Sequence, residues 1–219
     1  MRKKIIAFDG PAGAGKSSVS KMVAKRLNCT YLDTGAMYRA ITYEALKKNI
    51  SEEKEIVQMV ENLNMDICAK EDTMHVFIDG EDITQYLRTS EVSSNVSRIS
   101  AFQGVRNAMV KLQRKVAEKG NVVLDGRDIG TVVLPDADLK IFLTASVHTR
   151  ALRRYKELKD TDTTLERIEE EIKRRDNLDM TRKISPLRKA DDAILLDNSD
   201  LTLEETADKI ISYWKKVSE

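Results

Sequence analysis

The sequence predicts an α/β fold in which a five-stranded parallel sheet is covered by helices on both faces. Short apolar runs alternate with segments of helical periodicity, and this alternation is typical of parallel sheets. Hydrophobic residues make up 41% of the 219-residue chain, which is enough to bury one sizeable core. The apolar runs that fit the five strands begin near residues 4, 30, 121, 139 and 193.

Local patterns place the elements of the first half in order along the chain. Strands are predicted at 3–8 and 30–33, and helices at 16–27, 36–48 and 52–62. The pattern changes between about 64 and 87, where two β-rich runs precede the hairpin turn signal Asp79-Gly80. We expect this segment to form a small β insertion.

The second half returns to alternating strands and helices. Residues 89–119 are predicted to be helical. Buried strands follow at 122–125, 139–143 and 193–196, charged helices at 146–158 and 164–178, and a closing amphipathic helix at 203–217.

Composition excludes several classes of protein. The net charge of +1 gives no reason to expect a nucleic-acid or acidic-membrane partner. Two cysteines, Cys29 and Cys68, are too few for a disulfide framework, so we expect free thiols in a reducing cytoplasm. The apolar run before Asp9 is too short for a signal peptide or a membrane span. Because the sequence shows no heptads and no large apolar surface stripe, we expect a monomer.

The strongest motif is Gly10-Pro11-Ala12-Gly13-Ala14-Gly15-Lys16-Ser17, which matches G-x-x-x-x-G-K-[ST] in full. Its glycines let backbone N–H groups point at phosphate oxygens, and the following helix adds partial positive charge. We expect Lys16 to reach the β- and γ-phosphates of ATP and Ser17 to offer its hydroxyl to Mg²⁺. The adjacent Ser18 is counted with the ATP-binding residues. The motif alone does not distinguish a kinase from a GTPase or a motor ATPase.

The rest of the sequence favours a small kinase. It lacks the Asn-Lys-x-Asp motif of GTPases and is too short for AAA-type or helicase ATPases. Phosphoryl transfer between small molecules needs many arginines, because catalysis is mostly positioning and charge neutralisation. Predicted helices of the second half supply such arginines, although for most of them a solvated helix face is the simpler interpretation: Arg150, Arg153, Arg154, Arg174, Arg175, Arg182 and Arg188.

Three of the charged residues near the end of the second charged helix are a different case. Spacings of four and three place Arg175, Asp179 and Arg182 on one face of a helix end. A carboxylate between two guanidinium groups can bond ribose hydroxyls while the arginines hold phosphate.

Two further clusters follow predicted strands, at the sheet edge where ligands bind in open α/β folds. In Leu32-Asp33-Thr34-Gly35-Ala36-Met37-Tyr38-Arg39, Arg39 can hold an acceptor phosphate, while Asp33 or Thr34 is also a good helix N-cap. In the stretch 124–131, Asp125 is similar to a Walker-B carboxylate that holds Mg²⁺ through water. Arg127 and Asp128 lie at the same edge, and the alternative is a turn with an incidental salt bridge.

With these residues the chain resembles the bacterial-type cytidylate kinases, which are P-loop nucleoside-monophosphate kinases, over essentially its whole length. The matching segments are the phosphate loop, 33–39, 80–83 in the insertion, 88–92, 125–133 and 135–137. The stretch Asp125-Gly126-Arg127-Asp128-Ile129-Gly130-Thr131-Val132-Val133 and the β insertion are specific to this family.

The resemblance implies a P-loop NTPase three-layer sandwich with a small nucleotide-binding insertion and a helical lid. Within a single kinase unit of residues 1–219, the core comprises 1–35, 100–149 and 183–219. The region that binds the nucleoside monophosphate spans about 36–99, with the β insertion at about 64–87. The lid over ATP spans about 150–182.

The resemblance also implies a reaction, the transfer of the γ-phosphoryl of ATP to CMP or dCMP with Mg²⁺, and roles for individual residues. Lys16, Asp125, Arg127 and Arg182 are the catalytic candidates, and Arg153 or Arg154 the lid contact to ATP. Three sets are expected to contact the acceptor: Thr34, Arg39, Arg127 and Arg182 at its phosphate, Ser97, Arg106 and Asp128 at cytosine, and Arg175 and Asp179 at the pentose.

Base chemistry agrees with this assignment. Ser97 and Asp128 can accept from the cytosine amino group, and Arg106 can donate to the ring acceptors. Uracil reverses the polarity at position 4, so we expect it to be the poorer acceptor. The alternatives are a P-loop kinase for another nucleotide or a shikimate-like acid, and a nucleotide-dependent binding module with a one-sided basic surface and no turnover.

Overall fold

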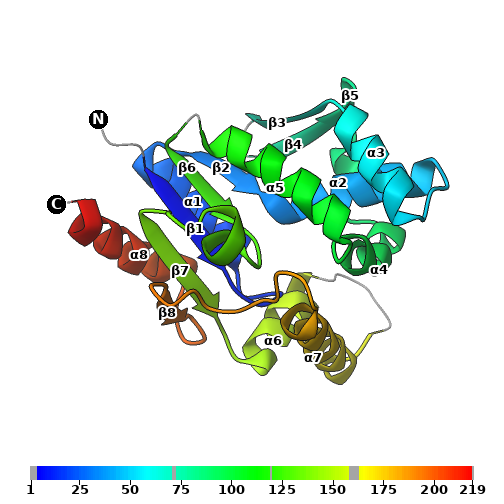
Figure 1. Cartoon of the computed structure of the whole chain (residues 1–219). Coiled ribbons are helices and arrows are strands. Elements are labelled where there is room, and N and C mark those ends of the chain that lie inside the picture. The colour runs from blue at the N-terminus through cyan, green and yellow to red at the C-terminus, as the bar shows by residue number, and fades with distance from the viewer. Residues whose placement is uncertain (1–3, 71–72, 119, 158–162, 219) are drawn as a thin grey trace. The chain divides into compact units, whose positions relative to one another are not determined.

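The computed structural model describes residues 4–70, 73–118, 120–157 and 163–218. The chain forms two compact units. Their helices and strands are labelled in Figure 1. The first unit comprises residues 1–31 and 117–219, and the second comprises residues 32–116. The predicted α/β fold with a five-stranded parallel sheet and a separate small antiparallel sheet is confirmed.

The large sheet has the strand order β2-β6-β1-β7-β8. β1 pairs in parallel with β6 and β7, and β7 pairs in parallel with β8. Each strand begins within two residues of a predicted apolar run: β1 (Ile5–Asp9), β2 (Thr30–Asp33), β6 (Val122–Asp125), β7 (Leu139–Thr144) and β8 (Ile194–Asp197). Because β1 lies between β6 and β7, the segments that follow β1 and β6 leave neighbouring strands at the same edge of the sheet.

Helices α1 (Lys16–Leu27) and α8 (Leu203–Ser218) pack against each other and against the sheet in the first unit (Figure 1). Their apolar faces bury Val23 and Trp214 against strand residues such as Phe8 and Ile141. α1 ends at Asn28, whose left-handed conformation (φ 53°) lets its N–H bond back to the last turn. The predicted bounds of this helix are therefore confirmed.

The two charged helices of the first unit are α6 (Val147–Glu157) and α7 (Leu165–Thr181), which lie side by side in Figure 1. Ala151, Ile168 and Ile172 form a small apolar cluster between them. α7 runs three residues beyond the predicted end at 178. A π-helical turn, η2 (Ile129–Val133), follows Asp128, in a segment for which no regular element was predicted.

The second unit holds four helices and the β insertion in its described residues. The helices are α2 (Thr34–Lys47), α3 (Glu53–Asn62), α4 (Ser90–Ile99) and α5 (Gln103–Ala117), the last of which ends one residue past the unit. The insertion consists of β3 (Met65–Lys70), β4 (Thr73–Ile78), β5 (Glu81–Asp82) and the 3₁₀ turn η1 (Thr84–Tyr86). Asp79 and Gly80 have φ values of 50° and 86°, as the predicted hairpin turn requires.

The helical region predicted at 89–119 is two helices rather than one, with a break at residues 100–102. A contact that the sequence does not reveal holds the start of the second helix. The N–H of Gly104 donates to Glu53 of α3 at 2.7 Å, which satisfies a free group at the start of α5. A Cβ at position 104 would lie 2.6 Å from Val57, so glycine is needed for this approach. Within the described ranges, no helix is both long and apolar enough to cross a membrane.

Candidate active site

The phosphate loop joins the central strand β1 to α1, and its glycines are required by backbone geometry. Gly10, Gly13 and Gly15 have φ values of 146°, 75° and 83°, which residues with a side chain rarely adopt. A Cβ on Gly10 would lie 2.0 Å from the carbonyl oxygen of Leu143. Gly15 is the N-cap of α1, so the loop delivers the positive end of that helix to the site. Ser18 lies exposed on its first turn.

Lys16 is buried at the start of α1, with only 5% of its surface exposed. Burial and the nearby Arg127 lower its pKa to about 7, while the carboxylates of Asp125 and Asp179 act in the opposite direction. These electrostatic contacts show that α1, the turn after β6 and the end of α7 bring charged groups to one place. The first unit thus gathers Lys16 and Arg127 with the carboxylates of Asp9, Asp125 and Asp179 at the phosphate loop.

Asp125, the last residue of β6, is oriented by two hydroxyl groups. Ser17 Oγ donates to one carboxylate oxygen at 2.9 Å, and the Tyr31 hydroxyl donates to the other at 2.8 Å. The adjacent hydroxyl and carboxylate oxygens are hard donors of the type that Mg²⁺ prefers, so these residues fit the ion predicted here. Tyr31 was not anticipated, because an isolated tyrosine on a strand carries no sequence signal.

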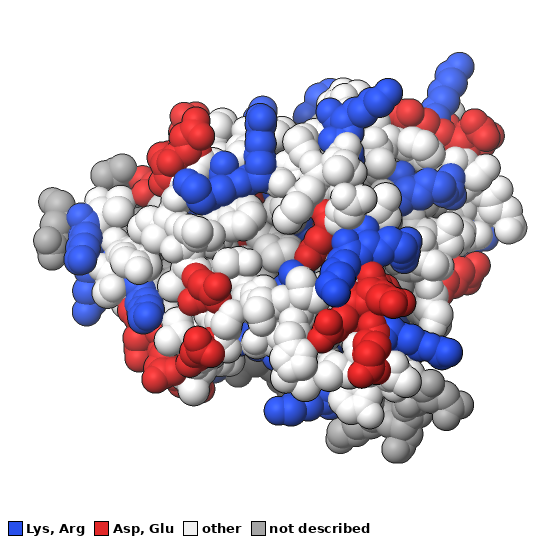
Figure 2. Space-filling model, turned by 90° about the horizontal axis from the view of Figure 1, so that it is seen from below, with Lys and Arg blue, Asp and Glu red and all other residues white. Residues whose placement is uncertain are grey.

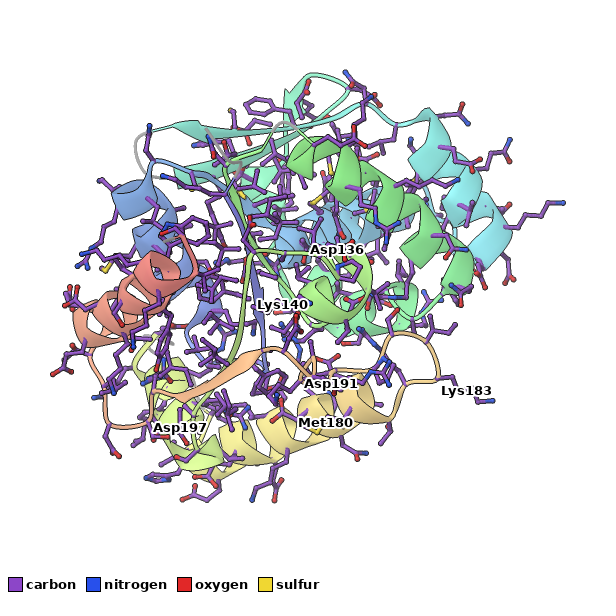
Figure 3. All side chains as sticks on the ribbon, turned by 60° about the vertical axis from the view of Figure 1, so that its left-hand side comes forward. Asp136, Lys140, Met180, Lys183, Asp191 and Asp197 are labelled. Carbon is purple, nitrogen blue, oxygen red and sulfur yellow. The ribbon has the colours of Figure 1, made fainter. Side chains whose placement is uncertain are left out.

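The turn after β6 and the end of α7 are joined by ion pairs. Arg127 Nε donates to Asp179 at 2.8 Å, and an Arg182 nitrogen lies 3.7 Å from Asp128. Arg182 is the C-cap of α7 and donates to the carbonyl of Ser185 at 2.6 Å. Just beyond it, Lys183 points away from the ribbon in Figure 3. Arg175 lies on α7 one turn before Asp179.

Arg150 is buried, which makes the interpretation of a solvated helix face wrong for this residue. Only 4% of it is exposed. Its guanidinium donates to the carbonyls of Ala145 and of Ala12 in the phosphate loop, both at 2.9 Å, and pairs with Asp176 of α7 at 2.7 Å. Arg150 therefore joins α6 and α7 to the backbone of the phosphate loop.

Of the two lid candidates, Arg153 faces the phosphate loop and Arg154 is exposed. Arg153 donates to the side chain and the backbone carbonyl of Asn198 at 3.1 and 2.8 Å. Asn198 in turn donates to the carbonyl of Ala14 at 3.1 Å. Arg154 lies 3.4 Å from Glu157 on its own helix. Asn198 was missed because its role depends on β8 ending beside the phosphate loop.

The second unit places four of the predicted residues on α2, α4 and α5. Asp33 caps α2, accepting from Ala36 N at 2.8 Å, and Arg39 Nη2 donates to the same carboxylate at 3.2 Å. Thr34 is buried at the first position of α2, and Ser97 is half-buried on α4.

Arg106 of α5 is held by its surroundings inside the second unit. Only 2% of the residue is exposed. Its guanidinium carbon lies 5.6 Å from the centre of the Tyr38 ring, and Nη1 donates to the carbonyl of Ser100 at 3.1 Å. A charge placed over a ring face is favourable in this geometry.

A phosphate loop between the central strand and the first helix of a parallel sheet defines a P-loop nucleotide-binding protein. Solved structures share this fold. The chain is similar to shikimate kinase from Bacteroides thetaiotaomicron (13% identity, 98% of this chain and 99% of that chain, TM-score 0.52). It is also similar to an uncharacterized protein from Eubacterium ventriosum (16% identity, 98% and 99%, TM-score 0.57). At these identities the likeness concerns the fold alone.

Sequence comparison identifies the family. The cytidylate kinase family model matches residues 6–216. The chain is 51% identical over 217 residues to cytidylate kinase from Bacillus cereus, covering 97% of this chain and 96% of that protein. It is 50% identical over 216 residues to the Bacillus subtilis enzyme of that name, covering 96% of each. The chain belongs to the cytidylate kinase family.

Proposed function

We propose that this chain transfers the γ-phosphoryl group of ATP to CMP or dCMP, giving ADP and CDP or dCDP. The observation that carries the proposal is the buried Lys16 of the phosphate loop, which is grouped with Arg127, Asp125 and Asp179 in a chain that matches cytidylate kinases over residues 6–216. Phosphoryl transfer between two anionic molecules needs alignment and charge neutralisation, and this cluster supplies both kinds of group.

ATP is proposed to lie on residues 10–18, with its phosphates facing Lys16 and the loop N–H groups. Arg153 is the lid arginine that the geometry favours as a contact. Its guanidinium would lie 3.9 Å from a Cβ on Gly15, and it is tied to the loop through Asn198. The role of Arg154 stays a prediction.

Mg²⁺ is proposed to accompany ATP. Ser17 and Asp125 would hold the ion, Asp125 through water, because their oxygens lie 2.9 Å apart beside Lys16. When bound, the ion neutralises charge on the phosphate oxygens. Tyr31 keeps the Asp125 carboxylate in one orientation through its hydrogen bond.

The acceptor assignments follow the family resemblance and the contacts inside each unit. In the first unit, Arg127 and Arg182 are assigned to the acceptor phosphate, Asp128 to the cytosine amino group, and Arg175 and Asp179 to the pentose. In the second unit, Thr34 and Arg39 are assigned to the acceptor phosphate. Ser97 and Arg106 are assigned to the base.

The proposed step is an in-line displacement. A phosphate oxygen of CMP attacks the γ-phosphorus of ATP, the bond to the β,γ-bridging oxygen breaks, and ADP leaves with that oxygen. No covalent enzyme intermediate is needed, because the acceptor oxygen is already a competent nucleophile once aligned. Movement of the proposed lid, residues 150–182, would exclude the water that otherwise hydrolyses ATP.

An acceptor assay tests the proposal. The purified chain is mixed with ATP, Mg²⁺ and either CMP, dCMP, UMP or AMP, and nucleotide products and free phosphate are measured. We expect CDP and dCDP, less UDP, and little free phosphate. Arg127→Met should lower kcat/KM for CMP by about 100-fold or more. Lys209→Met, which removes an exposed lysine of α8 outside the proposed lid, should leave it unchanged. Free phosphate in place of CDP would refute the proposal.

The partner and location of the enzyme complete the proposal. We propose that it works on small molecules as a cytoplasmic monomer. Basic and acidic side chains are interspersed on the face seen in Figure 2, which supports small-molecule substrates over a nucleic-acid partner. Light scattering of the purified chain would reveal any stable oligomer.

A further inference from the structure

Asp9 occupies a position that connects the phosphate loop to the turn after β6. It is the last residue of β1 and directly precedes Gly10. Its side chain is buried, with 4% of the residue exposed. One carboxylate oxygen accepts from the N–H of Ile129 and the other from the N–H of Gly130, both at 2.7 Å. These two N–H groups begin η2, immediately after Asp128.

The local geometry is built around these two hydrogen bonds. N–H groups at the start of a helical turn have no partner within the turn, and the N-cap side chain of Asp128 does not cap η2. A Cβ at position 130 would lie 3.3 Å from an Asp9 oxygen and 3.1 Å from the Lys140 side chain, so glycine allows the close approach. Lys140, labelled on β7 in Figure 3, directs its ammonium to Asp192 at 2.7 Å.

The chemistry at position 9 calls for a carboxylate. An amide of the same size has one acceptor oxygen and would turn its NH₂ group toward one of the two donors. Burial raises the pKa of Asp9 to about 6, and Asp128 also raises it, whereas the two backbone hydrogen bonds and Lys16 lower it. The group is therefore mostly ionised at neutral pH, and hydrogen bonds to a charged acceptor are stronger and shorter than neutral ones.

We propose that Asp9 is a positioning residue that fixes Arg127 and Asp128 for the acceptor nucleotide. The inference rests on the roles proposed above for those two residues. Asp9 accepts hydrogen bonds from the N–H groups of Ile129 and Gly130. These bonds fix the direction of the backbone just before them, which carries Arg127 and Asp128.

The phosphate loop has separate supports, so the effect of Asp9 should be selective. Arg150 and Asn198 hold the carbonyls of Ala12 and Ala14 without involving Asp9. Loss of the Asp9 hydrogen bonds should therefore loosen the acceptor side more than the ATP side.

Asp9→Asn tests this, with Asp138→Asn as the matched control. Asp138 also accepts from a backbone N–H of β1, that of Ile5 at 2.9 Å, but at the opposite end of the strand. We expect Asp9→Asn to raise the KM for CMP by about tenfold or more, with the KM for ATP within about threefold. Asp138→Asn should leave both constants within about twofold. Gly130→Ala places a Cβ 3.3 Å from an Asp9 oxygen and should disturb the same hydrogen bonds. We expect it also to raise the KM for CMP more than the KM for ATP.

Amide exchange provides a readout that does not depend on activity. Labelling the nine glycines with ¹⁵N lets the Gly130 N–H be followed in each variant. We expect its hydrogen exchange to be slow in the wild type and in Asp138→Asn and faster in Asp9→Asn.

The outcomes separate the two proposals. The positioning role would be overturned if Asp9→Asn raised the KM values for CMP and ATP equally. It would also be overturned if the Gly130 N–H exchanged faster while the KM for CMP stayed unchanged. A wild-type chain that makes no CDP would overturn the proposed function itself.

Discussion

Replacing Lys16 with methionine tests whether burying the Lys16 ammonium destabilises the folded chain when no nucleotide is bound. The ammonium is buried, donates to the Pro11 carbonyl at 2.7 Å, and has its pKa lowered from 10.5 to about 7, chiefly by burial. Folding thus removes most of the hydration of a cation whose phosphate partners arrive only with the nucleotide. Methionine has a similar length and no charge.

The pKa shift sets the magnitude and the sign. Between pH 7 and 10.5 the unfolded chain binds more protons at this lysine than the folded chain, so the free energy of unfolding rises with pH. One pKa unit is about 1.4 kcal/mol, which makes the cost of Lys16 about 4 kcal/mol at pH 7 and about 2 kcal/mol at pH 9. The lost bond to Pro11 offsets about 1 kcal/mol. We expect the free energy of unfolding of Lys16→Met to be higher than that of the wild type, by up to about 3 kcal/mol at pH 7 and about 1 kcal/mol at pH 9.

The assay is urea unfolding without nucleotide at pH 7 and pH 9. Lys209→Met, which removes an exposed lysine from α8, is the control and should match the wild type at both pH values. A Lys16→Met protein less stable than the wild type at pH 7, or a stability difference that does not change with pH, would refute the reasoning.

Further predictions concern the backbone and the lid. Gly10→Ala should abolish soluble expression or cost more than about 3 kcal/mol, because its Cβ would meet the Leu143 carbonyl at 2.0 Å. Gly80→Ala, with φ of 86° and open space around it, should cost only about 1 kcal/mol in the same unfolding assay. Arg150→Lys should lower the free energy of unfolding by about 3 kcal/mol, since one ammonium cannot reproduce a guanidinium that joins Ala12, Ala145 and Asp176; an unchanged unfolding midpoint would contradict that account.

Local signals explain why much of the fold could be predicted. The helical spacing of Val19, Met22, Val23 and Leu27 predicted α1 at its observed bounds. In the structure, the left-handed residue Asn28 ends the helix. Strand β2 was likewise predicted at its observed residues. In each case the determining residues lie within a few positions of the element.

Contacts between distant residues explain what was missed. The start of α5 is held by Glu53 of α3, which lies 51 positions away in the chain. Arg150 looked like one more surface arginine, because its partner Ala12 lies 138 positions away. Tyr31 and Asp9 carry no recognisable motif for the same reason.

The sequence by itself determined the order of strands and helices, the phosphate loop and the family. These features depend on hydrophobic periodicity, on glycine conformations and on residues that are neighbours in the chain. Only the tertiary structure decided which groups surround the loop. Asp9 accepts from the turn after β6, Tyr31 donates to Asp125, and Arg150 donates to the carbonyl of Ala12 in the loop. The physical reason is that a hydrogen bond acts over about 3 Å, and only the folded sheet brings residues more than 90 positions apart within that distance.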